Sequence, residues 1–346
     1  MKFIQLILCF SFLTSTLLGQ NNPASVQDSI QVFYSELFNQ LEQNYLYTES
    51  VDWQELQPHI LSKALEANSF YEALEMCPVL FDSIKGDHTL LFTERKLYQS
   101  TLKKELSQEQ FHRNLLVEYA ANPGFSVEVL GDQCGYIFIP GMLLLNAPQE
   151  ELDAKAQEMY RAIVAADSQH QIKGWIIDLR LNIGGNANVM LTGLYHLLGN
   201  GTTYLELDAN KHVTSRKGLL EGTLYDNHQE IIHISPTLAP NPEVPVAIIT
   251  GLMTASAGEF VALGFRGRKN TLIIGEESYG LTTSNDLFEL PFNTTMAITL
   301  SYGTDRSAVF TNSIEPDVKV VKEADLEHLL QDKNIIEAVR FIDQER

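Results

Sequence analysis

The sequence predicts an α/β fold, in which a helical N-terminal region precedes a domain of alternating strands and helices. Apolar residues recur at helical spacing in the first third of the chain, and Asn122-Pro123-Gly124 then interrupts that pattern. After this break, short apolar runs rich in β-branched residues alternate with amphipathic stretches. Because repeated strand–helix–strand units build parallel sheets covered by helices, we expect a largely parallel sheet in the second region.

The N-terminal region, taken as residues 21–122, is expected to be a helical domain. One apolar stripe has the spacing of an amphipathic helix and consists of Ile30, Phe33, Tyr34, Leu37 and Leu41. The same reasoning predicts further helical stretches at Trp53–Leu65, Phe70–Ile84 and Glu109–Tyr119.

The second region, residues 123–346, is expected to form the α/β domain. The patterns predict strands at Val127–Leu130, Tyr136–Ile139, Trp175–Leu179, Val246–Thr250 and Thr271–Ile274. They predict helices at Glu150–Ala166, Val189–Leu198 and Ala257–Phe265. Two later strands, Phe288–Leu290 and Met296–Tyr302, are expected without a defined place in the sheet.

Composition limits the class of protein. A chain of 346 residues with 45% apolar and 20% charged residues is typical of a folded protein of about two domains. The formal net charge of −20 repels phosphate backbones, so nucleic acid is excluded as an expected partner. The oligomeric state is left open by the sequence.

The first twenty residues have the pattern of a secretory signal peptide. Lys2 precedes an almost wholly apolar run from Phe3 to Leu18, and polar residues follow from Gly19. A buried helix is the alternative. The signal pattern predicts an exported protein, periplasmic or extracellular. Since no later stretch approaches about 20 apolar residues, we expect no membrane span after signal removal.

The cysteines and histidines do not indicate a metal site. Cys77 and Cys134 remain after the signal peptide and would pair or persist as buried thiols, the second being more typical of cysteine. Neither belongs to a CxxC motif, no H-E-x-x-H motif is present, and the histidines are scattered. We therefore expect neither metal nor cofactor.

Ser256 stands where an apolar strand gives way to a helix. Its hydroxyl would lie at the positive end of the helix dipole, and the amide of Ala257 would be an unpaired donor of the first turn. Such a donor stabilises an oxyanion. The alternative is that Ser256 only caps the helix, and this segment alone favours the cap.

A second strand, ending at Asp178, runs into Arg180, Asn182 and the pair Gly184-Gly185. Adjacent glycines present backbone amides without side-chain obstruction, so Gly184 or Gly185 would supply a second oxyanion donor. The alternative is a tight turn, with Asp178 and Arg180 in a structural ion pair.

Together the two segments resemble the C-terminal processing (tail-specific) serine peptidase family, whose pattern is roughly D-L-R-x-N-x-G-G followed by S-A-[SG]-E. Residues 273–280 resemble its V-G-E-x-T-x-G with serine for threonine, and Leu290-Pro291 fits its L-P. Residues 313–317 fit its G-I-x-P-D with Ser313 in place of glycine. Residues 45–47 and 51–53 resemble an N-terminal helical domain of one branch, so the resemblance spans nearly all of the mature chain.

The resemblance implies a crotonase/ClpP-like catalytic domain and endopeptidase chemistry with Ser256 as the nucleophile. One branch places its catalytic lysine directly after T-x-G, where this chain has Leu281, and an aspartate where it has Gly267. Leucine takes no proton, so a Ser–Lys dyad at these positions is excluded. About 35 residues, including one predicted helix, separate Pro140 from Trp175 and leave no apparent room for the family's PDZ insertion.

The other branch, similar to tricorn protease and the retinoid-binding-protein repeats, takes a histidine from the N-terminal part. Gly86-Asp87-His88-Thr89 fits its D-x-H-[ST] element, shortened by one residue. An imidazole with an ordinary pKa of about 6.5 accepts a serine proton near neutrality. The alternative is a surface histidine or a core histidine with its own partners.

A histidine base needs a group that orients it. Asp87 is its neighbour in the chain, and Glu315 is nearest to where this branch keeps its glutamate. Glu259, one turn after Ser256, is a third candidate that would brace the site, unless it is a solvated helix carboxylate.

These inferences predict an exported serine endopeptidase that works through an acyl-enzyme. His88 would deprotonate Ser256, and the amides of Ala257 and Gly184 or Gly185 would hold the oxyanion. The first rival is a catalytically inactive peptide- or ligand-binding protein on the same scaffold. The second is an acyl-CoA hydratase or isomerase, against which the export signal and the serine-centred motif both argue.

Overall fold

The computed structural model describes residues 25–131, 133–144 and 146–345, and the chain divides into two compact units. Unit 1 comprises the described chain up to Lys103 together with Asn285–Leu300, and unit 2 comprises Lys104–Ser284 and the chain from Ser301 onward. The sequence places the boundary at residue 122, whereas residues 104–122 group with unit 2 and 285–300 with unit 1. The predicted signal peptide lies outside the described residues.

Unit 1 is built on helices. Its helices are α1 (Val26–Asn44), η1 (Thr48–Ser50), α2 (Trp53–Ala64), α3 (Phe70–Ala73) and α4 (Met76–Ser83). The Ser25 side chain accepts a hydrogen bond from the Asp28 amide and so caps α1. The predicted apolar stripe of α1 is buried, while the single helix predicted over residues 70–84 is divided into α3 and α4.

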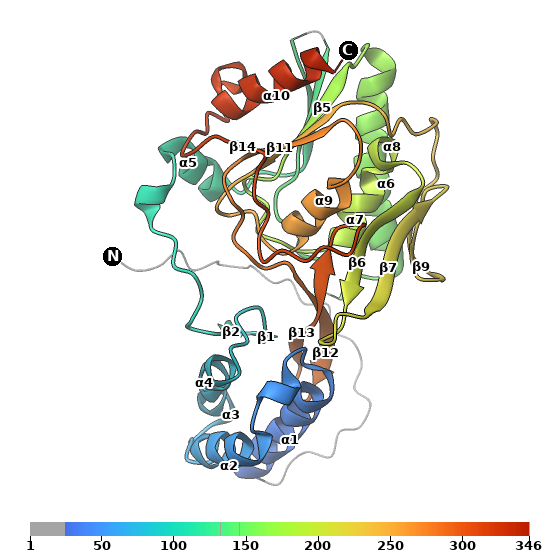
Figure 1. The fold of residues 1–346 in the computed structure, drawn as a ribbon. Helices are drawn as coiled ribbons and strands as arrows, with labels where there is room; N and C mark the ends of the chain where they lie inside the picture. The colour runs from blue at the N-terminus through green and yellow to red at the C-terminus, as the bar shows by residue number, and fades with distance from the viewer. Residues whose placement is uncertain (1–24, 132, 145, 346) are drawn as a thin grey trace. The chain divides into compact units, whose positions relative to one another are not determined.

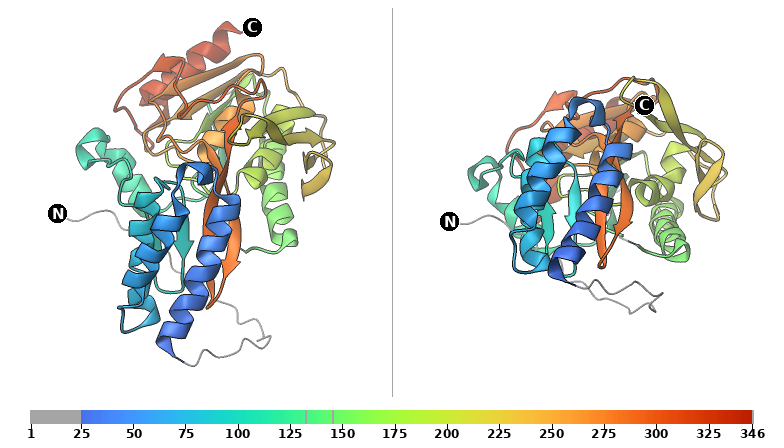
Figure 2. Two further views of the ribbon diagram at one scale, coloured as in Figure 1. Left: turned by 60° about the horizontal axis from the view of Figure 1, so that its bottom comes forward. Right: turned by 90° about the horizontal axis from the view of Figure 1, so that it is seen from below.

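Strands that the sequence did not predict complete unit 1. They are β1 (Leu90–Phe92) and β2 (Leu97–Gln99), and β1 pairs antiparallel with Thr295–Ala297 of β13 (Thr294–Thr304). β13 and β12 (Thr283–Leu290) contribute residues to both units. Leu290, Met296 and Ile298 share a core with α1, which Figure 2 shows in blue near these orange strands.

The central sheet of unit 2 has the strand order β14-β11-β10-β5-β4-β3. Its strands are β3 (Ser126–Leu130), β4 (Cys134–Phe138), β5 (Gly174–Asp178), β10 (Val246–Thr250), β11 (Thr271–Gly275) and β14 (Val318–Lys319). All neighbouring pairs are parallel except β3 with β4. The expected parallel sheet is thus confirmed, and β4, β5 and β10 are buried throughout, as strands covered on both faces must be.

Helices cover both faces of this sheet (Figure 1). On one face, Ile177 and Ile248 pack with α6 (Gln149–Gln169), α7 (Ala187–Gly193), α8 (Tyr195–Leu198) and α9 (Ala257–Phe265). On the other, Ile176 and Ile249 pack with α5 (Arg113–Ala121) and α10 (Lys333–Gln344). Successive side chains of a strand point to opposite faces of the sheet, so neighbouring residues of β5 and of β10 belong to the two different cores.

An antiparallel sheet also belongs to unit 2. It contains β6 (Gly201–Leu207), β7 (Val213–Leu220), β8 (Thr223–Asp226) and β9 (Gln229–His233), and β6 pairs with Tyr302–Thr304 of β13. The short helices η2 (Gln108–Gln110) and η3 (Leu329–Gln331) complete the described elements. Within the described ranges, no helix combines the length and apolar character needed to cross a membrane.

Candidate active site

The carboxyl ends of β5 and β10 bring two turns of unit 2 together. The strands are parallel neighbours with Asp178 opposite Ile249, so the chain leaves both at the same edge of the sheet. The Thr254 hydroxyl donates to the Leu179 carbonyl at 2.8 Å, which ties the second turn to the first. The glycine pair and the serine predicted from sequence therefore lie in adjoining turns.

Ser256 has an unusual backbone conformation. It occupies the N-cap position of α9 with φ 50° and ψ −118°, whereas ordinary N-cap residues have extended dihedrals. A non-glycine residue in such a region costs about 1–3 kcal/mol and is held there by its surroundings. Ser256 is thus in the capping position that the sequence allowed, but in a strained turn between strand and helix of the kind that exposes catalytic nucleophiles.

Gly184 and Gly185 both have positive φ, 119° and 123°. A Cβ on Gly184 would lie 3.0 Å from the Ser256 Cβ and 3.5 Å from its Oγ, so the Gly184 backbone packs directly on the serine side chain. A Cβ on Gly185 would lie 2.0 Å from the Met142 carbonyl oxygen. Glycine is required at both positions by conformation and by close approach.

The amides of these turns differ in their partners. The Gly184 amide donates to Asn182 Oδ1 at 3.1 Å. In the part of the chain that the structure describes, neither the Gly185 amide nor the Ala257 amide donates to another described residue. Ala257 is the first residue of α9, where the helix itself supplies no acceptor. In the two turns, the amides of Gly185 and Ala257 are therefore left without an acceptor among the described residues.

Asn182 links the two turns, a role that the sequence analysis did not assign. Its carbonyl accepts from the Ala255 amide at 2.9 Å, and its side chain accepts from Gly184. A Cβ on Gly258 would lie 2.8 Å from the Asn182 carbonyl oxygen, so only glycine fits there. The signal in the sequence was the position of this asparagine within D-L-R-x-N-x-G-G.

The Asp178–Arg180 alternative is confirmed as a structural ion pair. The buried Arg180 guanidinium contacts Asp178 at 2.6 Å and Asp332, the N-cap of α10, at 2.5 Å. Burial, the largest single effect, would raise the pKa of Asp332, but the charge of Arg180 and the hydrogen bonds from Arg180, Asp325 and Asn334 together hold that pKa below its usual range. Tyr136 also donates to Asp178 at 2.9 Å, so this cluster fixes the end of β5.

Glu259 is wholly buried, which excludes the solvated alternative. Its carboxylate accepts from the Ser256 amide at 2.8 Å, the Gly280 amide at 2.9 Å and the Leu281 amide at 2.7 Å. The Ser278 hydroxyl donates to it at 2.5 Å and accepts from the Ile314 amide at 2.7 Å. Burial raises the pKa of Glu259 to about 7 although these donors favour its charged form.

His88 belongs to unit 1, on the turn between α4 and β1, and is only 5% exposed, so it is not a surface histidine. Asn285 donates to its carbonyl at 2.6 Å. Asp87 is exposed, and its charge acts on Lys103, whose pKa burial lowers to about 8. In unit 2 the Glu315 side chain is exposed, and its carbonyl accepts from Arg266 at 3.0 Å.

The structure thus brings Ser256, Gly184, Gly185, Ala257 and Glu259 together in unit 2, while His88 and Asp87 are neighbours in unit 1. The pairing of His88 with Ser256, and of either Asp87 or Glu315 with His88, stays a prediction.

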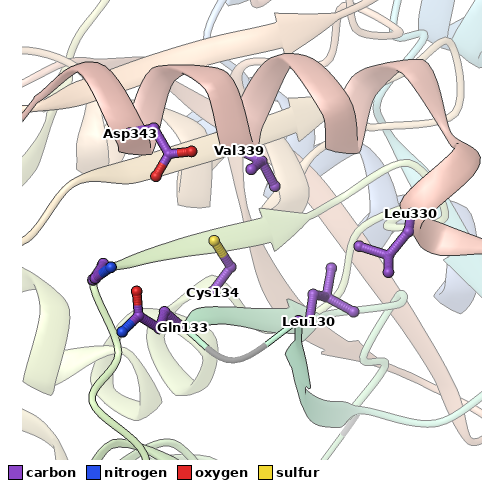
Figure 3. Close-up of a pocket in the computed structure, with 8 residues that line it drawn as sticks. Leu130, Gln133, Cys134, Leu330, Val339 and Asp343 are labelled. Atoms are coloured by element: carbon purple, nitrogen blue, oxygen red, sulfur yellow. The ribbon is translucent and has the colours of Figure 1, made fainter.

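A pocket of about 470 Å³ lies elsewhere in unit 2, at the amino ends of β4 and β5. In Figure 3, Val339 and Asp343 project from α10 toward the strand that begins at Cys134. Ligands of such sheets bind beyond the carboxyl ends of the strands, so this pocket is not the candidate site. Cys77 and Cys134 are both buried and not in a disulfide, and no cluster of metal-ligating side chains occurs among the described residues.

Comparisons with known proteins agree with the geometry. The nisin-resistance protein of Lactococcus lactis subsp. lactis is 24% identical over 303 residues, which cover 85% of this chain and 84% of that protein. A carboxyl-terminal-processing protease of Picosynechococcus sp. (strain ATCC 27264 / PCC 7002 / PR-6) is 26% identical over 189 residues, 53% of this chain and 38% of that protein.

Among solved structures, a lipoprotein from Streptococcus agalactiae has the same fold. It superimposes with a TM-score of 0.68 at 21% identity and covers 96% of this chain and 100% of its own. The family model described as Peptidase family S41 matches residues 133–320, which contain both turns of the site. The chain therefore belongs to Peptidase family S41, the family of the C-terminal processing proteases.

Proposed function

We propose that this protein is an exported serine endopeptidase with Ser256 as its nucleophile. The observation that carries the proposal is the strained Ser256 backbone, with Gly184 packed on the serine side chain. A hydroxyl held at a strand-to-helix turn, beside backbone amides that have no acceptor in the described part of the chain, suits acyl transfer. The crotonase/ClpP-like form of the catalytic domain is part of this proposal.

The proposed reaction passes through an acyl-enzyme. Ser256 Oγ attacks the carbonyl carbon of a peptide bond while His88 takes its proton, and the oxygen of the tetrahedral intermediate accepts from the Gly185 and Ala257 amides. We prefer Gly185 to Gly184 because the Gly184 amide already donates to Asn182. His88 then returns the proton to the leaving amine, and water repeats the sequence to release the acyl group.

The base is proposed to be His88 because Leu281, where the other branch has lysine, takes no proton. Asp87 and Glu315 are the proposed orienting groups for its imidazole. The Asp87 and Glu315 carboxylates are both exposed, so a hydrogen bond from either one to the His88 imidazole would be accessible to solvent. The chemistry proposed here requires neither metal nor cofactor.

The substrates are proposed to be peptides or proteins, as membership of a peptidase family implies. Nisin is the first peptide to test, because the relative that matches over most of this chain is a nisin-resistance protein. That relative and the similar lipoprotein support placement in the cell envelope or outside the cell, in line with the signal-like first twenty residues.

The proposal is tested by peptide hydrolysis. Purified full chain is incubated with nisin and with a mixed peptide library, and products are identified by mass spectrometry. We expect new peptide termini with the wild type and with Ser235→Ala, an exposed-serine control, and none with Ser256→Ala. Hydrolysis that persists in Ser256→Ala would remove Ser256 from the mechanism.

A second candidate function is peptide binding without catalysis. The replacement of the family lysine by Leu281 and the shortened element at His88 favour it. This function is tested by calorimetry. A peptide that binds to the wild type but is never cleaved would favour the binding protein over the peptidase.

A further inference from the structure

Glu259 connects the proposed nucleophile with a segment that follows β11. Its carboxylate binds the backbone of Ser256 on one side and the segment Ser278–Leu281 on the other. These contacts join parts of the chain about twenty residues apart in sequence, which the pairing of β10 with β11 brings to one edge of the sheet and the Tyr279 amide also ties through the Thr254 carbonyl at 2.8 Å. The carboxylate is therefore more than the second half of a helix cap.

The donors around this carboxylate match its charged form. Oε2 accepts from the Ser256 and Leu281 amides, and Oε1 accepts from the Gly280 amide and the Ser278 hydroxyl. A carboxylate accepts all of these at once, whereas a protonated carboxyl would direct its own hydrogen at one of them. Protonation must break or reverse at least one of these hydrogen bonds.

The Ser256 amide is the contact that matters for chemistry. It belongs to the peptide group between Ala255 and Ser256, and the Ala255 amide is held by the Asn182 carbonyl. The strained dihedrals of Ser256 and the direction of the next amide, that of Ala257, depend on this peptide group. Loss of the Glu259 contact would let the turn relax and misdirect both the hydroxyl and the oxyanion donor.

We infer that ionised Glu259 is a positioning residue, which holds the Ser256 turn and the Ser278–Leu281 segment in one reactive arrangement. This inference rests on the proposed function, since it concerns the same serine. Glu259 touches no reacting atom in the proposed mechanism, so it acts only through the backbone of its neighbours.

Other charged groups near this carboxylate have other partners. Glu277 accepts from Ser313, Tyr279 donates to the Lys104 carbonyl, and Glu276 lies in the field of Arg180. Glu315 follows Ile314 and is exposed. No ion pair with Glu259 occurs among the described residues, and its hydrogen bonds come from three backbone amides and one hydroxyl.

The burial of this carboxylate predicts a pH dependence with a definite sign. Because burial raises the pKa of Glu259 to about 7, the native protein binds a proton that the unfolded chain releases near pH 4.5. Stability from this group is thus complete below pH 4.5 and is lost as the pH rises through about 7. The reactive form is the one that appears at the higher pH, so reactivity rises as this stability falls.

The experiment measures the rate at which a fluorophosphonate reacts with the full chain from about pH 5 to about pH 9. The variants are Glu259→Gln and the exposed-neighbour control Glu277→Gln. In the wild type, two groups must lose protons, so the logarithm of the rate rises with a slope of about two on the acid side. Glu259→Gln should react at least about tenfold more slowly at pH 8 and show a slope of about one, while Glu277→Gln matches the wild type.

A folded Glu259→Gln protein that keeps the wild-type rate and slope overturns the inference, and so does a slope of one in the wild type. Urea unfolding adds a readout that needs no reactivity. From pH 5 to pH 8 the unfolding constant of the wild type should rise at least about tenfold relative to Glu259→Gln. A ratio independent of pH contradicts an ionising Glu259 even if the protein never reacts, whereas absence of any reaction counts against the proposed function.

Discussion

At the scale of single residues, the backbone of Ser256 ties structure to proposed chemistry. Its φ of 50° suits glycine, yet the position holds a serine, whose hydroxyl glycine would lack. The surrounding contacts from Glu259, Asn182 and Gly184 maintain this conformation at a cost to stability. Such a cost without a packing benefit is typical of functional positions.

This strain predicts an unequal effect of two substitutions at Ser256. Both Ser256→Gly and Ser256→Ala remove the hydroxyl, but only glycine adopts this backbone without strain. We expect Ser256→Gly to be more stable than Ser256→Ala by about 1 kcal/mol, measured by urea unfolding at one pH. If alanine is as stable as glycine or more so, the turn is not strained in solution.

The proposed role of His88 rests on the chemistry of its imidazole and on its place in the sequence motif, not on a described contact with Ser256. We expect His88→Ala to slow the fluorophosphonate reaction by about 10²–10⁴-fold, as loss of a general base does, without loss of fold. The exposed His170→Ala variant is the matched control and should react at the wild-type rate. An unimpaired His88→Ala protein would place the base elsewhere.

At the scale of elements, the site depends on two parallel strands that end at one edge of the sheet. β5, β10 and α9 were predicted closely, because buried parallel strands are continuous apolar runs and α9 consists, apart from Glu259, of apolar residues and glycine. The strands β6–β9 were missed because their sequences mix polar and apolar residues. The turn geometry at Ser256 was also beyond prediction, since strain arises from contacts distant in sequence.

The contact between these elements is tested at Gly258, which packs on Asn182. Gly258→Ala places a methyl group 2.8 Å from the Asn182 carbonyl oxygen, and we expect a loss of about 1–3 kcal/mol in the free energy of unfolding. Gly124→Ala is the control, because a Cβ there meets no atom within 4 Å. Equal stabilities of the two variants in urea would contradict the tight packing of the two turns.

At the scale of the whole molecule, the two units are not consecutive pieces of sequence. The chain enters unit 1 a second time with Asn285–Leu300, and Met296 and Ile298 complete a core begun by α1. No local pattern marks such a return, so the sequence predicted these strands without placing them. The proposed catalytic pair is divided in the same way, with His88 in unit 1 and Ser256 in unit 2.

The most direct test of the central claim is to locate the covalent adduct after reaction with a fluorophosphonate. Mass spectrometry of the intact chain and of its peptides should find one adduct, on the Ser256 hydroxyl, and none in Ser256→Ala. An adduct on another residue, or a wild-type chain that stays unmodified at saturating reagent, would contradict the account.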